Sequence, residues 1–223
     1  YAKQAAFLRY PADWIIRFHN MYLRNALPAG NVLDYGCGGG NNACFFMEKG
    51  YQVWGVDVTP HVLPLVRSNI ESRHLDVRNA ERFSVIDVLD PNLPFEDGFF
   101  DLCVSNQVLY YQPTESAIHD VCREIARVLR PGGVVFFTMM GPKNYYITEH
   151  TKQVLNGHVH DIRIDAPNHR LAGVREMIYL IDDEAHLKQV FSEFEPITTG
   201  YFDQAMFDMK SNFHWIFVGR RRG

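Results

Sequence analysis

Short apolar segments alternate with amphipathic segments along residues 32–140 of this chain. The apolar segments have the length of strands, and the clearest amphipathic segment, 113–130, repeats its apolar residues at the i, i+3, i+4 spacing of a helix. Strands that alternate with helices form βαβ units, whose strands lie parallel in one sheet with helices on both faces. We therefore predict strands at 32–35, 52–58, 82–88, 99–105 and 134–140, and helices at 41–49, 59–73 and 113–130.

The alternation stops after residue 140. Residues 141–176 are rich in His, Asn, Gly and Pro and show no sustained periodicity, so we expect an irregular insertion after the fifth strand. Regular structure is predicted to resume with a segment at 176–181, a helix at 182–194 and two closing strands at 196–202 and 213–219. No helix separates the closing strands, so they should pair antiparallel. The expected fold is α/β: a Rossmann-like, doubly wound, seven-stranded sheet, mostly parallel with an antiparallel final strand, preceded by N-terminal helices.

Composition and charge exclude several classes of protein. The formal net charge of −4 and the isoelectric point of about 6.2 argue against a nucleic-acid partner, and the basic tail Arg220–Arg222 is interpreted as a solvated terminus. The longest apolar runs are only strand-sized, so no membrane span is expected. No signal peptide is visible, although the chain starts at Tyr1, and we expect a cytoplasmic protein. The four cysteines form no CxxC pair and are expected to be reduced core residues: Cys37, Cys44, Cys103 and Cys122.

A glycine-rich turn, "VLDYGCGGGNN", follows the first predicted strand and opens a helix. Glycines allow a tight turn and let a ligand lie against the main chain. A P-loop would need a lysine after the glycines, and none is present. A dinucleotide site would need a third glycine where Asn41 stands, and the charge of Asp34 would repel a pyrophosphate.

The stretch Asp34-Tyr35-Gly36-Cys37-Gly38-Gly39-Gly40 resembles the signature of class I S-adenosylmethionine-dependent methyltransferases. That cofactor carries a sulfonium and an ammonium group and no phosphate, so a carboxylate beside it is favourable. The resemblance extends to Asp57, 23 residues after Asp34, to "VIDVLDPNLPFEDGFFDLCVSNQVLYY" and to "LRPGGVVFF". The resemblance rests on motifs over residues 30–140 and on the order of helices and strands over residues 177–219.

The resemblance implies a set of cofactor contacts. Asp57 would accept hydrogen bonds from the ribose hydroxyls, and Asp87 from the adenine amino group, with the main chain of Val88 against the ring. The backbone of Ser105 and Asn106 would line the methionine end. The full set of expected contacts is Asp34, Gly36, Cys37, Gly38, Gly40, Asp57, Val58, Asp87, Val88, Ser105, Asn106 and, from an N-terminal lid, Tyr10.

The acceptor side is less defined, because methyl transfer is a direct displacement that needs no fixed catalytic residue. Candidate acceptor contacts are Trp14, Tyr110, Tyr111, Tyr145 and Tyr146, and candidate bases are Tyr110, His150 and His158. Tyr110-Tyr111 stands where many family members carry histidine, which weakens a histidine base at that place. His150, His158, His160 and His169 are also consistent with surface-loop residues. A metal on His158, His160 and Asp161 is an alternative, but three closely spaced donors on an irregular segment define no coordination geometry, and no metal is expected.

The predicted function is S-adenosylmethionine-dependent methyl transfer to an O, N or C nucleophile of a small-molecule acceptor, by in-line displacement, with S-adenosylhomocysteine as product. Neither a nucleic-acid nor a membrane partner is expected, and the protein would be a monomer or homodimer. The alternatives are an NAD-dependent oxidoreductase and a non-catalytic S-adenosylmethionine-binding protein. One domain is predicted over 1–223, comprising a helical lid (1–29), a cofactor-binding core (30–140), a substrate-side insertion (141–176) and the C-terminal part of the sheet (177–223).

Overall fold

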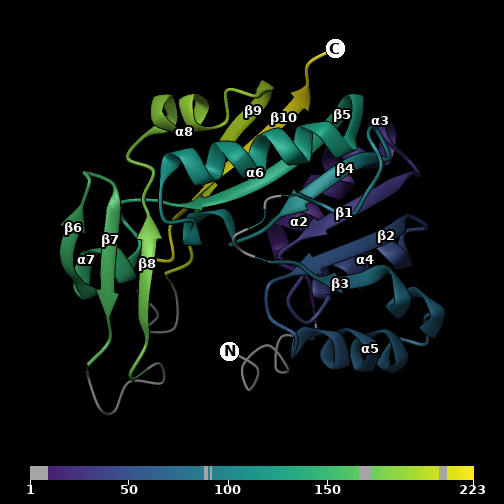
Figure 1. Ribbon diagram of the computed structural model, residues 1–223, viewed down its shortest axis with the longest axis horizontal. Helices are drawn as coiled ribbons and strands as arrows, with labels where there is room; N and C mark the ends of the chain where they lie inside the picture. The colour runs from purple at the N-terminus through teal and green to yellow at the C-terminus, as the bar shows by residue number, and fades with distance from the viewer. Residues whose placement is uncertain (1–9, 88–89, 91, 166–171, 206–209) are drawn as a thin grey trace. The chain divides into compact units, whose positions relative to one another are not determined.

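The computed structural model describes residues 10–87, 90, 92–165, 172–205 and 210–223 (Figure 1). The first nine residues of the predicted lid, together with Val88 and His169, lie outside the described residues. The chain forms two compact units, one of Tyr1–Ser105, Glu124–Val135 and Gly223, and one of Asn106–Arg123 and Phe136–Arg222.

In the first unit, one helical stretch precedes the sheet, as predicted. It consists of α2 (Asp13–Phe18), a π-helical turn η1 (His19–Leu23) and α3 (Arg24–Ala26). Ile15, Phe18 and Leu23 are buried, whereas Tyr22 is only partly buried. A π-turn inserts one residue into the helical repeat, which brings Leu23 rather than Tyr22 onto the buried stripe with Ile15 and Phe18.

Four parallel strands form this unit's part of the main sheet, as the alternation predicts. They are β1 (Asn31–Tyr35), β2 (Gln52–Asp57), β3 (Phe83–Val85) and β4 (Phe100–Ser105), and the pairs β1–β2, β1–β4 and β2–β3 are all parallel. Consecutive residues Val32 and Leu33 of β1 are both fully buried, as in a strand that is covered on both faces. The strand β3 is shorter than the predicted segment 82–88.

Two helices connect these strands, α4 (Asn41–Glu48) and α5 (Val62–Ser72), and a 3-10 helix η2 (Val77–Arg82) precedes β3. The helix α5 starts later than predicted, because Thr59 and Pro60 form a turn in which the Val62 amide donates to the Thr59 carbonyl at 3.1 Å. Pro64 then falls in the first helical turn, where its missing N–H breaks no helical hydrogen bond.

The long helix α6 (Glu115–Val128) leads directly into β5 (Leu129–Met140). The helix was expected to continue to Arg130 and the strand to begin at 134. Pro131 accounts for the non-helical backbone of Arg130, because a proline disfavours helical backbone at the residue before it. The full sheet has the order β3-β2-β1-β4-β5-β10-β9. Its last two strands, β9 (Phe194–Phe202) and β10 (His214–Arg221), pair antiparallel, which confirms the predicted seven-stranded, mostly parallel sheet.

The prediction of an irregular insertion over 141–176 is wrong in one respect, because this segment has regular structure. It contains α7 (Tyr145–His150), β6 (Thr151–Leu155) and β7 (Val159–Arg163), and β8 (Arg175–Tyr179) crosses its predicted end. The three strands lie side by side as an antiparallel sheet of order β6-β7-β8 (Figure 1). Asn156 and Gly157 form the β6–β7 turn with φ values of 50° and 80°, and an Asn-Gly pair is a strong hairpin signal that the interpretation overlooked.

The helix α8 (Glu184–Val190) follows β8, within the predicted segment 182–194, and the Asp183 carboxylate caps its N-terminus by accepting from the His186 amide at 2.8 Å. Among the described residues, no helix is both long and apolar enough to cross a membrane. All four cysteines are buried free thiols, as predicted.

Candidate functional site

The turn after β1 has a backbone that requires glycine. Gly36, Gly38 and Gly40 have φ values of 75°, 50° and 77°, in the left-handed region where a side chain is strained. The amides of Gly36 and Cys37 both donate to the Val56 carbonyl, at 2.8 Å and 3.0 Å, and this fixes the turn to β2.

Asp57, the last residue of β2, holds the turn from the other side. Its Oδ2 accepts from the Gly38 amide at 3.0 Å, and its Oδ1 accepts from the Thr59 amide at 3.0 Å. A carboxylate oxygen has more than one acceptor site, so Asp57 retains acceptor capacity for hydroxyl groups of a ligand. Its predicted role toward ribose hydroxyls is compatible with this geometry and stays a prediction.

Gly38 and Gly40 have different surroundings. A Cβ atom at Gly40 would lie 3.3 Å from a methyl group of Val66, so this glycine lets α5 pack closely against the turn. A Cβ atom at Gly38 would meet nothing within 4 Å. Asn69 of α5 also donates to the Gly39 carbonyl, at 3.0 Å. The turn is therefore fixed on its α5 side and borders open space at Gly38.

Asp34, in β1, is the least satisfied acid near the turn. Its side chain is buried, and neither carboxylate oxygen has a hydrogen-bond partner among the residues that the structure describes. Burial raises its pKa to about 7, and the charge of Asp57 adds to this effect. The Ala43 amide lowers the pKa in part, although it lies outside standard hydrogen-bond geometry. Because an unpaired buried charge is costly, this carboxylate favours a cationic ligand.

Ser105, at the end of β4, has a similarly unsatisfied hydroxyl. The side chain is fully buried and its oxygen has no hydrogen-bond partner among the described residues. In the parallel register, Asp34 lies opposite Val104, the residue before Ser105. Two unpartnered polar groups therefore lie at the carboxyl ends of neighbouring strands, where open α/β sheets bind ligands.

The structure places the other predicted cofactor contacts of this unit nearer the surface. Tyr10 is 75% exposed and Val58 is 50% exposed, and Asp87 is also exposed, two residues after β3. Trp14 lies in α2 and is partly buried. The roles of these residues stay predictions.

In the second unit, Asn106 and Gln107 follow β4 and are bound to β5. Thr138 donates from its hydroxyl to Asn106 Oδ1 at 3.3 Å and accepts from the Gln107 amide at 2.7 Å. Gln107 has a φ of 61°, which is uncommon for a residue with a side chain and often marks a functional loop.

The predicted tyrosines form two aromatic pairs. Tyr110 and Tyr111 lie in a 3-10 helix, η3 (Leu109–Tyr111), with ring centroids 4.7 Å apart; Tyr110 is buried and Tyr111 is exposed. Tyr145 and Tyr146 begin α7 with ring centroids 4.2 Å apart, and the ring of His150 lies 5.9 Å from that of Tyr145. The structure thus brings His150 next to one predicted tyrosine pair.

His214 of β10 is a residue that the sequence interpretation did not identify. Its ring lies 5.8 Å from that of Tyr110, and its Nδ1 donates to the Asn212 carbonyl at 3.0 Å. Burial lowers its pKa to about 4, so the imidazole is neutral. A single buried histidine in a strand gives no signal in the sequence.

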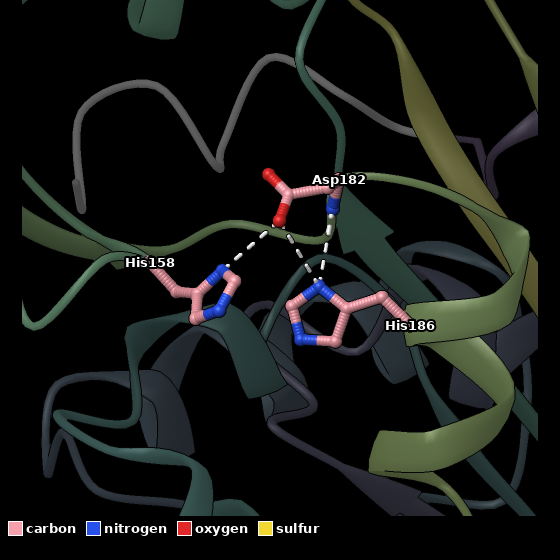
Figure 2. A group of neighbouring side chains, drawn as sticks. All are labelled: His158, Asp182 and His186. Carbon is pink, nitrogen blue, oxygen red and sulfur yellow. Dashed lines mark hydrogen bonds and ion pairs between the residues drawn. The ribbon is translucent and has the colours of Figure 1, made fainter.

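The structure does not bring His158, His160 and Asp161 together as a shared metal site would require. His160 Nδ1 lies 3.1 Å from the Thr151 hydroxyl, and Asp161 pairs with Arg163 at 2.6 Å. His158 instead approaches Asp182 and His186 (Figure 2). Asp182 and His186 stand at an i, i+4 spacing that the sequence displays, but only the three-stranded sheet reveals their proximity to His158.

Comparison with known proteins identifies the fold. Residues 33–137 match the family model of a methyltransferase domain. A protein of Synechocystis sp., described as an uncharacterized methyltransferase, is 31% identical over 120 residues, or 53% of this chain and 51% of the relative. The chain thus spans about half the length of the curated relatives that it matches.

Two solved structures share the fold. A SAM-dependent methyltransferase from Methanosarcina mazei has a TM-score of 0.71 and 18% identity, covering 96% of this chain and 99% of its own. A 1,6-didemethyltoxoflavin-N1-methyltransferase from Burkholderia thailandensis, with bound 1,6-didemethyltoxoflavin and S-adenosylhomocysteine, has a TM-score of 0.60 and 18% identity, covering 95% and 79%.

Proposed function

We propose that this chain is a class I S-adenosylmethionine-dependent methyltransferase that transfers the methyl group of that cofactor to an O, N or C nucleophile of a small-molecule acceptor. The observation that carries the proposal is the buried Asp34 carboxylate, which lacks a partner among the described residues and lies beside a turn that borders open space. This combination favours a cationic ligand that lies against the main chain.

The residues present fit S-adenosylmethionine. Asp34 would bind its positively charged methionine end, Gly38 would leave room beside the main chain, and Asp57 would accept from the ribose hydroxyls. The unpartnered Ser105 hydroxyl offers a further polar contact. When bound, the cofactor supplies an electrophilic methyl group on a sulfonium sulfur.

The chain's own contribution is binding and orientation. The glycine turn is held by Val56 and Asp57 before any ligand arrives, so little backbone order has to be created on binding. A base is needed only for an acceptor that arrives protonated. Tyr110, His150 and His158 remain the candidates for that role, and Trp14, Tyr111, Tyr145 and Tyr146 remain candidates for acceptor contacts.

Two observations support a small-molecule acceptor. The net charge of −4 disfavours nucleic acid, whose binding depends on basic side chains. The Burkholderia thailandensis relative in fold was solved with bound 1,6-didemethyltoxoflavin and S-adenosylhomocysteine. We extend this class of acceptor, without a specific compound, to the present chain.

Calorimetric titration with S-adenosylmethionine, S-adenosylhomocysteine and NAD tests the cofactor. We expect the first two to bind with micromolar or tighter dissociation constants, about −8 kcal/mol, and NAD not to bind. Asp34→Asn should weaken both, whereas Glu195→Gln, which neutralises an exposed acid of β9, should not. Preferential binding of NAD would overturn the proposal.

Transfer of a labelled methyl group to members of a metabolite panel tests the reaction itself. Cofactor binding without transfer to any acceptor would favour the non-catalytic alternative. Once an acceptor is found, alanine variants of His150, His158, His160 and His169 test the histidine base. Normal turnover in all four variants would eliminate it.

A further inference from the structure

Three nitrogen and oxygen donors converge away from the glycine turn, and one of them, His158, is also a candidate base for the proposed methyl transfer (Figure 2). His158 lies in the turn after β6, Asp182 lies between β8 and α8, and His186 lies in α8. Asp182 Oδ2 is 3.1 Å from His158 Nδ1 and 3.5 Å from His186 Nδ1, and one donor atom of each residue lies within 4.8 Å of the others.

The hydrogen bonds around His186 determine which of its nitrogens carries the proton and which offers a lone pair. The carboxylate of Glu115 can only accept, so the Tyr179 hydroxyl, 2.8 Å from Glu115 Oε2, must donate to it. The Tyr179 oxygen then accepts from His186 Nε2, which lies 3.2 Å away and therefore carries the proton. The neutral tautomer thus presents the Nδ1 lone pair to Asp182, and the Asp182 amide, which donates to Nδ1 at a long 3.3 Å, agrees with this assignment.

His158 faces the same point. Its Nδ1 is shielded from solvent and has no hydrogen bond of standard geometry among the described residues, although Asp182 Oδ2 is 3.1 Å away. The lone pair of His186 Nδ1 and the carboxylate of Asp182 both repel a further acceptor. A positive charge at their centre would satisfy all three groups at once.

We propose that His158, Asp182 and His186 form a binding site for one divalent transition-metal ion of the zinc class. At Zn–N and Zn–O bonds of about 2.0–2.1 Å, tetrahedral ligands lie about 3.3 Å apart, which is midway between the two separations of 3.1 Å and 3.5 Å. Two imidazoles and one carboxylate suit zinc better than calcium or magnesium, which take mostly oxygen ligands. Three protein ligands leave the fourth position to water or to an exchangeable ligand.

The surroundings have the features of a metal site. Histidine ligands commonly donate their second ring nitrogen to an outer acceptor, and His186 does so through Tyr179 to Glu115 of α6. The His158 and Asp182 side chains are 36% and 53% exposed, so an ion can enter from solvent. The ion would connect the β6–β7 turn to the start of α8.

The competing arrangement is an ion pair in which a proton takes the place of the metal. His158 or His186 would then carry a charge beside Asp182, and the cluster would bind no ion tightly. The metal site does not rest on the proposed methyl transfer, because zinc alone is the probe and neither cofactor nor acceptor is needed.

The test uses the full chain without a histidine tag, stripped with a chelator and titrated with Zn²⁺ in competition with a chromophoric chelator. We expect each chain to bind one Zn²⁺ ion tightly, the Tm to increase on zinc addition, and Co²⁺ to give the absorption bands of a tetrahedral site. Asp182→Asn, His158→Gln and His186→Ala should abolish saturable binding. Tyr179→Phe should weaken it about tenfold by releasing His186.

His61→Ala is the matched control, since it removes an exposed histidine outside the cluster and should leave zinc affinity unchanged. His158→Gln alters only a partly exposed turn residue, so it remains informative if the Asp182 variant fails to fold. The proposal is wrong if the wild-type chain binds no zinc equivalent tightly, or if the cluster variants bind zinc as the wild type does.

Discussion

The glycine turn around Asp34 and the cluster of His158, Asp182 and His186 both gather electron-rich groups, but they assemble them differently. At the turn, the residues follow one another along the chain, and their amides donate to the Val56 carbonyl and the Asp57 carboxylate, which fixes them. In the cluster, a hairpin turn, a loop and a helix each contribute one donor.

This difference indicates the size of the expected ligand. At the turn, one buried carboxylate stands beside glycine backbone and open space, an arrangement that favours a large organic cation. In the cluster, three donors lie so close together that only a single small ion fits among them. The burial of the acid differs as well, since Asp34 is inaccessible whereas Asp182 is half-exposed.

Removing the charge at the turn should have the largest effect. In Asp34→Asn, the cofactor loses its charged partner, and a charge-assisted contact contributes about 1.5–3 kcal/mol. We expect S-adenosylmethionine to bind about 100-fold more weakly, as measured by calorimetric titration at pH 7.5. An unchanged affinity would mean that Asp34 does not face the cofactor.

The pH should affect cofactor binding almost as strongly. The pKa of Asp34 is raised to about 7, so below that pH the cofactor must displace a proton to meet a carboxylate. Between pH 7 and pH 5.5 we expect the dissociation constant to rise about tenfold per pH unit, and to stay nearly constant in Asp34→Asn. A dissociation constant that does not change with pH in the wild type would contradict the link between Asp34 protonation and cofactor binding.

The same shift has a consequence for the ligand-free protein. Between the ordinary pKa of 3.8 and about 7, the folded chain holds a proton at Asp34 that the unfolded chain has released. The free energy of unfolding should therefore fall as the pH rises through this range and then level off. Denaturant titrations of wild type and Asp34→Asn at several pH values measure the difference in slope.

Two glycines allow a smaller and matched comparison. Gly38 and Gly157 have φ values of 50° and 80°, and a Cβ atom at either would meet nothing within 4 Å. Alanine at either position should lower the free energy of unfolding by about 1 kcal/mol, because only the backbone is strained. Only Gly38→Ala should also weaken cofactor binding, and an equal loss in Gly157→Ala would show that the effect is not local to the turn.

The smallest expected effect is that of a substitution at one site on ligand affinity at the other. Asp182→Asn should leave the affinity for S-adenosylmethionine within about twofold, and Asp34→Asn should leave zinc affinity within about twofold, since sites without shared partners are usually independent. Reciprocal titrations of each variant with the other ligand measure this. A change above about tenfold in either direction would show that the sites are coupled.

Most of the main sheet was predictable from sequence, because its strands and helices carry strong local signals. The buried pair Val32 and Leu33 and the amphipathic helix α6 are examples. The sheet of β6, β7 and β8 was not predicted, because β6 is largely exposed and its apolar alternation is faint. The Asn156-Gly157 turn was the available signal.

The two sites also differ in how far the sequence could predict them. Asp34 and its glycines are contiguous, so a sequence motif identified them, although the lack of a partner for Asp34 required the structure. Asp182 and His186 had a helical spacing but no visible connection to His158, because strand pairing between distant segments brings them together. Non-local pairing of this kind leaves no mark on a single sequence.

Cys37 lies between Gly36 and Gly38, so the proposed cofactor site places a sulfur nucleophile next to an alkylating agent. Burial raises the pKa of this thiol, and the charges of Asp34 and Asp57 raise it further. A thiol that stays protonated and shielded is a poor nucleophile. The carboxylates proposed to attract a methyl donor would therefore also keep Cys37 from being methylated by it.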